Sequence, residues 1–275
     1  MARGRDTGDD VPPLWQGLLI GAIAGLLSGL FGVGGGIVIV PALIGMTTME
    51  RKLAHGTSLA ATLPIAAASL VTYAANGNVD WTVAAFFTVG AVAGAVAGTQ
   101  LLQIIPKTPL TVIFVVVILS TALRLLLSDD VMGRAPLSFG GMVALVLIGF
   151  LTGLLAGLLG IGGGVVLVPA MVVLFSMLPV VAKGTSVAVI VPSALVGTLR
   201  NRSKRNADLP TAAAIGAAGI ASAVVGGMVS DGIGADVSNF MFALLLVVVA
   251  MLQIRTLIPP RLGRDDEPHP PETVL

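Results

Sequence analysis

The stretch Gly25-Leu-Leu-Ser-Gly-Leu-Phe-Gly-Val-Gly-Gly-Gly-Ile-Val-Ile-Val-Pro-Ala-Leu43 occurs a second time in the chain, as Gly153-Leu-Leu-Ala-Gly-Leu-Leu-Gly-Ile-Gly-Gly-Gly-Val-Val-Leu-Val-Pro-Ala-Met171. Gly162 follows Gly34 by 128 residues, and the rest of the motif keeps the same offset without a gap. Three glycines in succession are unfavourable in any helix, because glycine loses the most backbone freedom on folding. A doubled glycine run inside apolar sequence therefore needs a structural or functional reason.

The same offset relates more distant segments, so the repeated unit is larger than the motif. His55-Gly-Thr-Ser58 is matched by Lys183-Gly-Thr-Ser186, and Asn78-Val-Asp80 by Asn206-Ala-Asp208. The repeat is therefore about 115 residues long. Internal repeats of this size in a polytopic chain are typical of transporters, in which the substrate site lies between the repeats.

The composition indicates a membrane protein. The 275 residues are 56% hydrophobic and 11% charged, with a mean hydropathy of +1.01. Charged residues separate apolar runs of roughly 18 to 25 residues, the length of a helix that crosses about 30 Å of hydrocarbon. The predicted fold class is all-α, with about eight helical segments in two pseudo-symmetric repeats of four, each opening on a broken or re-entrant segment.

Five regions follow from this pattern, and the first apolar block sets the arrangement of each half. Block 14–46 would measure roughly 50 Å as one helix, so we expect a helix over 14–31, a non-helical elbow and a shorter helix that ends near 46. Pro41 fits the first turn of that second helix. Further helices are expected over about 57–75, 81–103 and 110–127, and again at the same offset. The regions are a polar tail (1–13), repeat 1 (14–128), a linker (129–138), repeat 2 (139–257) and a polar tail (258–275).

Lysine and arginine place both termini in the cytoplasm under either of two arrangements. If each broken segment crosses the membrane, the halves are parallel and eleven basic residues lie on the side of the termini against four opposite. If each dips in and returns, the halves are inverted and the ratio becomes twelve to three. The charge bias leaves the choice open.

The two elbows are the predicted substrate site. Backbone amides left unpaired at the start of a helix, together with the positive end of its dipole, form an anion site. The alternative is a purely structural hinge. The glycines spaced four apart, from Gly17 to Gly29, are interpreted instead as a helix contact face. The amide-donating glycines are Gly34, Gly35, Gly36, Gly162, Gly163 and Gly164, and the hinge residues are Gly32, Pro41, Gly160 and Pro169.

Thr57, Ser58, Thr185 and Ser186 are the predicted hydroxyl ligands, on the expectation that they lie at the start of a helix. They donate to a substrate oxygen in one interpretation and cap helix ends in the other. His55 and Lys183, at equivalent positions, are interpreted as loop signals of topology rather than as ligands. Asp80 and Asp208 are expected to cap helices.

Several function classes are excluded by what the sequence lacks. The glycine runs have neither the spacing nor the Lys-Ser/Thr of a nucleotide loop, and there is no cysteine. No span carries an acidic residue that would serve a proton relay or a cation site. We therefore expect no enzyme activity, metal, cofactor or nucleic acid partner.

The doubled G-x-G-G-G-x-x-x-x-P element, with Ala-His-Gly-Thr-Ser in the first half and Ala-Lys-Gly-Thr-Ser in the second, resembles the sulfite exporter TauE/SafE family over about residues 14–257. The resemblance implies a plasma (inner) membrane transporter of sulfite, sulfoacetate or related anions. We expect alternating access around a site between the elbows; the alternatives are a passive anion channel and a non-transporting scaffold or sensor. The expected partners are a small anion and the lipid bilayer. A coupling proton or ion, a homo-oligomer, the identity of the anion and the direction of transport are left open.

Overall fold

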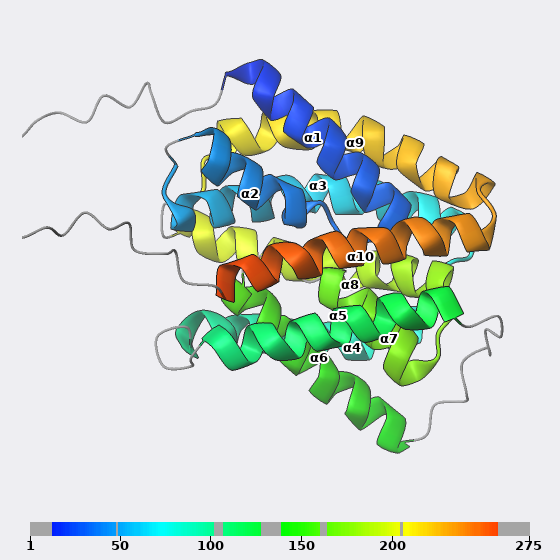
Figure 1. Ribbon diagram of the computed structural model, residues 1–275. Coiled ribbons are helices and arrows are strands. Elements are labelled where there is room, and N and C mark those ends of the chain that lie inside the picture. Colours follow the sequence, from blue (N-terminus) through cyan, green and yellow to red (C-terminus); the bar gives the residue numbers. More distant parts are fainter. Residues whose placement is uncertain are drawn as a thin grey trace, which may run out of the picture.

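The computed structural model describes residues 13–47, 49–101, 107–127, 139–159, 164–203 and 206–257, and all regular structure in these ranges is helical (Figure 1). Five of the helices are long and apolar enough to cross a membrane. The chain is therefore an all-α polytopic membrane protein. Its helices are α1 (Leu14–Phe31), α2 (Gly36–Met46), α3 (Arg51–Ala75), α4 (Trp81–Leu101), α5 (Lys107–Leu127), α6 (Phe139–Leu159), α7 (Gly164–Phe175), α8 (Pro179–Ser203), α9 (Leu209–Gly232) and α10 (Ala235–Leu257).

The predicted elbow in the first half is a break of four residues, 32–35, which we call the first break. Gly32, Gly34 and Gly35 have φ angles of 67°, 75° and 75°, a left-handed conformation that L side chains rarely adopt. The break therefore requires glycine. Pro41 lies beyond the first turn of α2, as Pro169 does in α7, so the prediction that proline begins these helices was wrong. The second break (160–163), with Gly160, Gly162 and Gly163, lies outside the described residues.

The spaced glycines of α1 form the predicted contact face, and their partner is α9. A Cβ atom at Gly21 would lie 2.1 Å from the carbonyl oxygen of Ile215, and one at Gly29 would lie 2.2 Å from that of Ala223. The two backbones touch, as small residues allow in membrane helix pairs. Because the contacts ascend together along both helices, α1 and α9 run in the same direction.

Helix α3 also runs in the direction of α9. Its Pro64 contacts Gly216 and its Thr72 contacts Gly227. Helices α1 and α3 are therefore parallel, so the chain must return between them, and α2 is the returning segment (Figure 1). The first break is thus the tip of a re-entrant pair rather than an interruption in a crossing helix.

The two halves are inverted with respect to each other. Helices α3 and α8 are equivalent in the repeat, and they run antiparallel: a Cβ atom at Gly56 near the start of α3 would lie 3.2 Å from Asn201 near the end of α8. At the other end, one at Gly184 would lie 3.0 Å from Tyr73. The halves also interlock, because α1 packs on α9 of the second half and α6 packs on α4 of the first.

Candidate functional site

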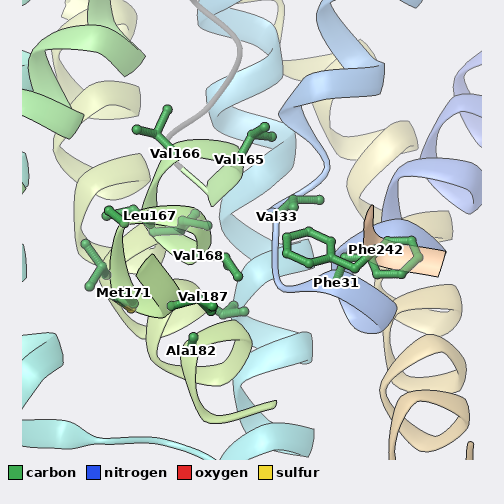
Figure 2. Packing of buried hydrophobic residues seen from close by; sticks show 14 of the residues in the cluster. Phe31, Val33, Val165, Val166, Leu167, Val168, Met171, Ala182, Val187 and Phe242 are labelled. Carbon is green, nitrogen blue, oxygen red and sulfur yellow. The ribbon is translucent and has the colours of Figure 1, made fainter. Parts of the chain in front are cut away.

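The first break meets the N-terminus of α7. A Cβ atom at Gly164, the first residue of α7, would lie 2.5 Å from the Cα atom of Val33 in the first break. Figure 2 shows Val33 next to Phe31 and facing Val165 and Val168 at the start of α7. Residues 31–36 are all buried. The first break and the N-terminus of α7 are therefore in backbone contact, at the place where inverted repeats hold their ligand.

A row of backbone amides at the first break lacks hydrogen-bond acceptors. The amides of Val38 and Ile39 both donate to the carbonyl oxygen of Gly35, at 3.0 and 3.2 Å. The five preceding amides, 33–37, donate to no group in the described part of the chain. Buried amides without acceptors are rare, and at a helix N-terminus they attract anions. This row includes three of the predicted ligands, Gly34, Gly35 and Gly36.

Side chains of α3 and α8 enclose Gly34. A Cβ atom there would lie 3.1 Å from Ile190 and 3.3 Å from the methyl carbon of Thr62. Thr62 and Ser58 lie one helical turn apart and are buried. Their hydroxyl groups make no hydrogen bond to the described part of the chain. Ser186, the equivalent of Ser58, donates to the carbonyl oxygen of Gly32 at 3.0 Å. Of these hydroxyl groups, that of Thr62 was not predicted from the sequence.

Thr57 and Thr185 connect the two halves. The Thr57 hydroxyl accepts a hydrogen bond from the backbone amide of Asp208 at 2.9 Å. The Thr185 hydroxyl accepts one from the backbone amide of Asp80 at 3.0 Å. Helix α3 begins at Arg51, so the prediction that Thr57 lies at a helix start was wrong, and Thr185 likewise lies beyond the first turn of α8. These hydroxyls hold the turns that precede α9 and α4, each in the opposite half.

The predicted caps Asp80 and Asp208 both begin helices, as expected. The Asp80 carboxylate accepts the amide of Val83 at 3.0 Å, which caps α4. Asp208 instead accepts the Thr211 hydroxyl, and it makes no cap to the α9 backbone. Capping by the side chain is thus confirmed for Asp80, while Asp208 is positioned through its amide by Thr57.

Thr57→Val and Thr185→Val are each expected to lower the stability of the folded protein by about 1 kcal/mol, because a backbone amide loses its acceptor. Thr→Ser at the same positions should keep most of the stability. The melting temperature of the detergent-purified protein measures the stability of the Val and the Ser variants. Anion affinity should stay within about twofold of wild type, because the hydroxyls are already engaged with the protein. Weaker anion binding with unchanged stability would assign them to the substrate instead.

Lys183 is a buried cation that the sequence analysis interpreted as a loop signal, and the structure corrects this. It lies inside α8 with 1% of its surface exposed. Its Nζ atom lies 2.6 Å from the Ser238 hydroxyl, and 5.7 and 5.4 Å from the ring centres of Phe31 and Phe242. No carboxylate among the described residues pairs with it.

These contacts offset much of the cost of burying the charge of Lys183, but they supply no counter-charge. Two cation–π contacts of a desolvated ammonium contribute about 2 kcal/mol or more each, and a hydrogen bond to a charged group about 1.5–3 kcal/mol. Removing an ion from water costs several kcal/mol even after the protein relaxes. The nearest carboxylate along α10, Asp236, is exposed. A small anion would complete the pairing.

Arg124 fixes the end of α7, a role that its place near the end of α5 did not predict. Its guanidinium donates to the carbonyl oxygens of Val172 and Val173 at 2.8 and 2.7 Å, and to the Ser176 hydroxyl at 3.2 Å. The last carbonyls of a helix have no partner of their own, and a cation there opposes the negative end of the dipole. Arg124 thus holds the helix that carries Gly164.

Arg124→Gln is expected to lower the free energy of unfolding by about 2–3 kcal/mol, because three hydrogen bonds from a charged donor are lost at the end of α7. Arg124→Lys should recover only part, since an ammonium cannot span the same acceptors in one plane. The melting temperature in detergent is the measurement, and Arg200→Gln, at an exposed arginine near the end of α8, is the control. A melting temperature equal to that of the control would contradict the assigned role.

An all-helical membrane protein of two inverted halves, in which the first break packs against the N-terminus of α7, has the architecture of a transporter. Residues 2–125 and 145–275 match the family Sulfite exporter TauE/SafE, and the chain belongs to this family. The relatives below are named as membrane transporters, a class distinct from enzymes.

Three relatives illustrate the range of the similarity. YunE of Bacillus subtilis (strain 168), a probable membrane transporter protein, is 30% identical over 66% of this chain and 76% of its own. A probable membrane transporter protein of Xylella fastidiosa (strain 9a5c) is 28% identical over 85% of this chain and 92% of its own. MJ0441 of Methanocaldococcus jannaschii, also a probable membrane transporter protein, is 29% identical over 55% of this chain and 59% of its own. No solved structure matches the chain.

Proposed function

We propose that this protein is a secondary transporter of small anions, in particular sulfur oxyanions or organosulfonates such as sulfite and sulfoacetate. The observation that carries the proposal is the row of five amides at residues 33–37 without acceptors among the described residues, of which residues 33–36 are buried. Such amides replace the water around an oxyanion without adding a counter-charge. The family name points to the same class of substrate.

The proposed site lies between the two breaks. Gly34, Gly35 and Gly36 supply amides from one side, and the hydroxyl groups of Ser58 and Thr62 supply donors from α3. Gly162, Gly163 and Gly164 supply amides from the second half by the internal repeat, and Ser186 positions the first break through Gly32. In alternating access, one half moves against the other around this site. Thr57 and Thr185 keep the halves connected rather than bind the substrate.

The proposed location is the plasma (inner) membrane, with both termini in the cytoplasm. Because α2 returns to the side where α1 begins, the basic residues divide twelve to three in favour of the side of the termini. Such a bias marks the cytoplasmic side. Arg200 and Arg202 at the end of α8 lie on that side, and Arg124 lies opposite.

The test is a flux panel in proteoliposomes with sulfite, sulfoacetate and taurine, each with and without a pH gradient. The expected result is saturable uptake of one or more of the anions, with accumulation that depends on a gradient. Flux that only equilibrates the anion would favour a passive channel. No flux of any anion by correctly inserted protein would refute transport and favour a scaffold or sensor.

A further inference from the structure

We propose that Lys183 and Ser238, with Phe31 and Phe242, form a second anion-binding site, separate from the amides of the first break and placed beside it. This set of residues is called the Lys183 site below. It rests on the proposed function, because its ligand is the same class of small oxyanion. The site would hold the anion before or after it occupies the breaks.

The ammonium group of Lys183 has unused binding capacity. It carries three N–H groups, and the only hydrogen bond among the described residues is the one to Ser238. The side chain is 1% exposed, so water cannot complete its shell from the bulk. A buried ammonium keeps its charge when a counter-charge is present. With no carboxylate paired to it in the described ranges, a bound anion is the counter-charge that fits.

The aromatic rings shape the Lys183 site for a small ligand. The rings of Phe31 and Phe242 stack with their centres 5.6 Å apart and an interplanar angle of 24° (Figure 2). They cover the ammonium from α1 and α10 and exclude water from one side of it. An anion bound there would therefore interact with Lys183 in a medium of low dielectric constant, where the attraction is stronger than in water.

The Lys183 site is joined directly to the first break. A Cβ atom at Gly32 would lie 2.3 Å from the carbonyl oxygen of Lys183, so the two backbones touch. One turn along α8, Ser186 donates to the carbonyl oxygen of Gly32. Phe31 is the last residue of α1 and precedes the break. An anion that leaves Lys183 thus has the amides of residues 33–37 next to it.

The Lys183 site belongs to one half only. The repeat positions equivalent to Lys183, Ser238 and Phe242 are His55, Leu110 and Phe114. Leucine offers no hydrogen bond, so the first half cannot build the same site. Thr185 contacts the turn before α4, which places the Lys183 site toward the end of the molecule opposite the start of α1. The site therefore serves the anion on one side of the membrane.

Lys183→Met tests the Lys183 site, because methionine fills similar space without charge. In gluconate buffer the variant is expected to melt at or above the wild-type temperature, since an unpaired buried charge is gone. Sulfite at roughly 100 times its Kd should raise the wild-type melting temperature by about 5 °C or more, and the rise should be clearly smaller in the variant, which keeps only the amides of the first break. The sulfite concentration for half-maximal flux should increase about tenfold or more. Lys52→Met, at an exposed lysine of α3, is the control.

Three outcomes separate this inference from the proposed function. Wild-type protein that is stabilised by sulfite and transports it, together with a Lys183→Met variant that behaves identically, overturns the Lys183 site and leaves the proposed function intact. Wild-type protein that neither binds nor transports any anion refutes the proposed function first. If Lys183→Met does not fold, Ser238→Ala takes its place: a sulfite response as large as that of wild type would overturn the site, and a reduced response supports it.

Discussion

Gly164→Ala is expected to abolish anion flux while the protein still inserts into the membrane. The added methyl group would lie within 2.5–2.6 Å of the Cα, carbonyl carbon and carbonyl oxygen of Val33. These are backbone atoms of the first break, so no side chain can rotate away, and α7 must move apart from the first break. Overpacking of a close contact costs about 1–3 kcal/mol or more. Flux in proteoliposomes, compared with that of empty liposomes, is the measurement.

Gly45→Ala is the matched control for this experiment. Gly45 lies in α2, the helix equivalent to α7, and a Cβ atom there would meet nothing within 4 Å. This variant should transport like wild type. Normal flux in Gly164→Ala would show that close contact between the first break and α7 is not needed, and the central site would have to be given up. Equal loss in both variants would point to a general sensitivity of the short helices instead.

The internal repeat made most of the helices predictable. Helices α3 and α8 span residues 51–75 and 179–203, which differ by the offset of 128 that the glycine motif shows. Similar sequences make similar local structure, and apolar length sets where a membrane helix can lie. The start of α3 was predicted six residues late, because Thr47–His55 is polar and reads as a loop. Its first turns nevertheless form, and Gly56 among them packs on Asn206 of the other half.

The direction of each half could not be predicted, because it depends on contacts between distant segments. Charge ratios of eleven to four and twelve to three favour the same side for the termini. Only contacts that ascend together show that α1 and α3 are parallel and that α2 returns. On α9 these are Gly21–Ile215 with Gly29–Ala223 for α1, and Pro64–Gly216 with Thr72–Gly227 for α3. The glycines of α1 from Gly17 to Gly29 were predicted to form a contact face, but a single sequence does not identify the helix that packs on it.

The site was predictable where it rests on the backbone and unpredictable where it rests on side chains. Consecutive glycines at membrane depth predict free amides, and residues 33–37 have them. The roles of Thr57 and Lys183 depend on Asp208 and Ser238, partners 151 and 55 positions away along the chain. Helix ends and loops were assigned by local pattern, so a lysine near a predicted loop was interpreted as a surface charge.

Gly184→Ala is expected to disrupt the connection between the halves and to prevent recovery of folded protein. Its methyl group would lie 2.0 Å from the carbonyl oxygen of Asn78, in the turn that Thr185 holds through Asp80. Because Thr185, the residue after Gly184, holds this turn, the turn cannot move away from the added methyl group. We therefore expect the free energy of unfolding to fall by about 3 kcal/mol or more. The monodisperse fraction and melting temperature after purification measure it. Gly232→Ala, with nothing within 4 Å, is the control. If both variants behave like wild type, the turn can shift to make room for the methyl group. The contact between Gly184 and Asn78 would then not be needed to connect the two halves.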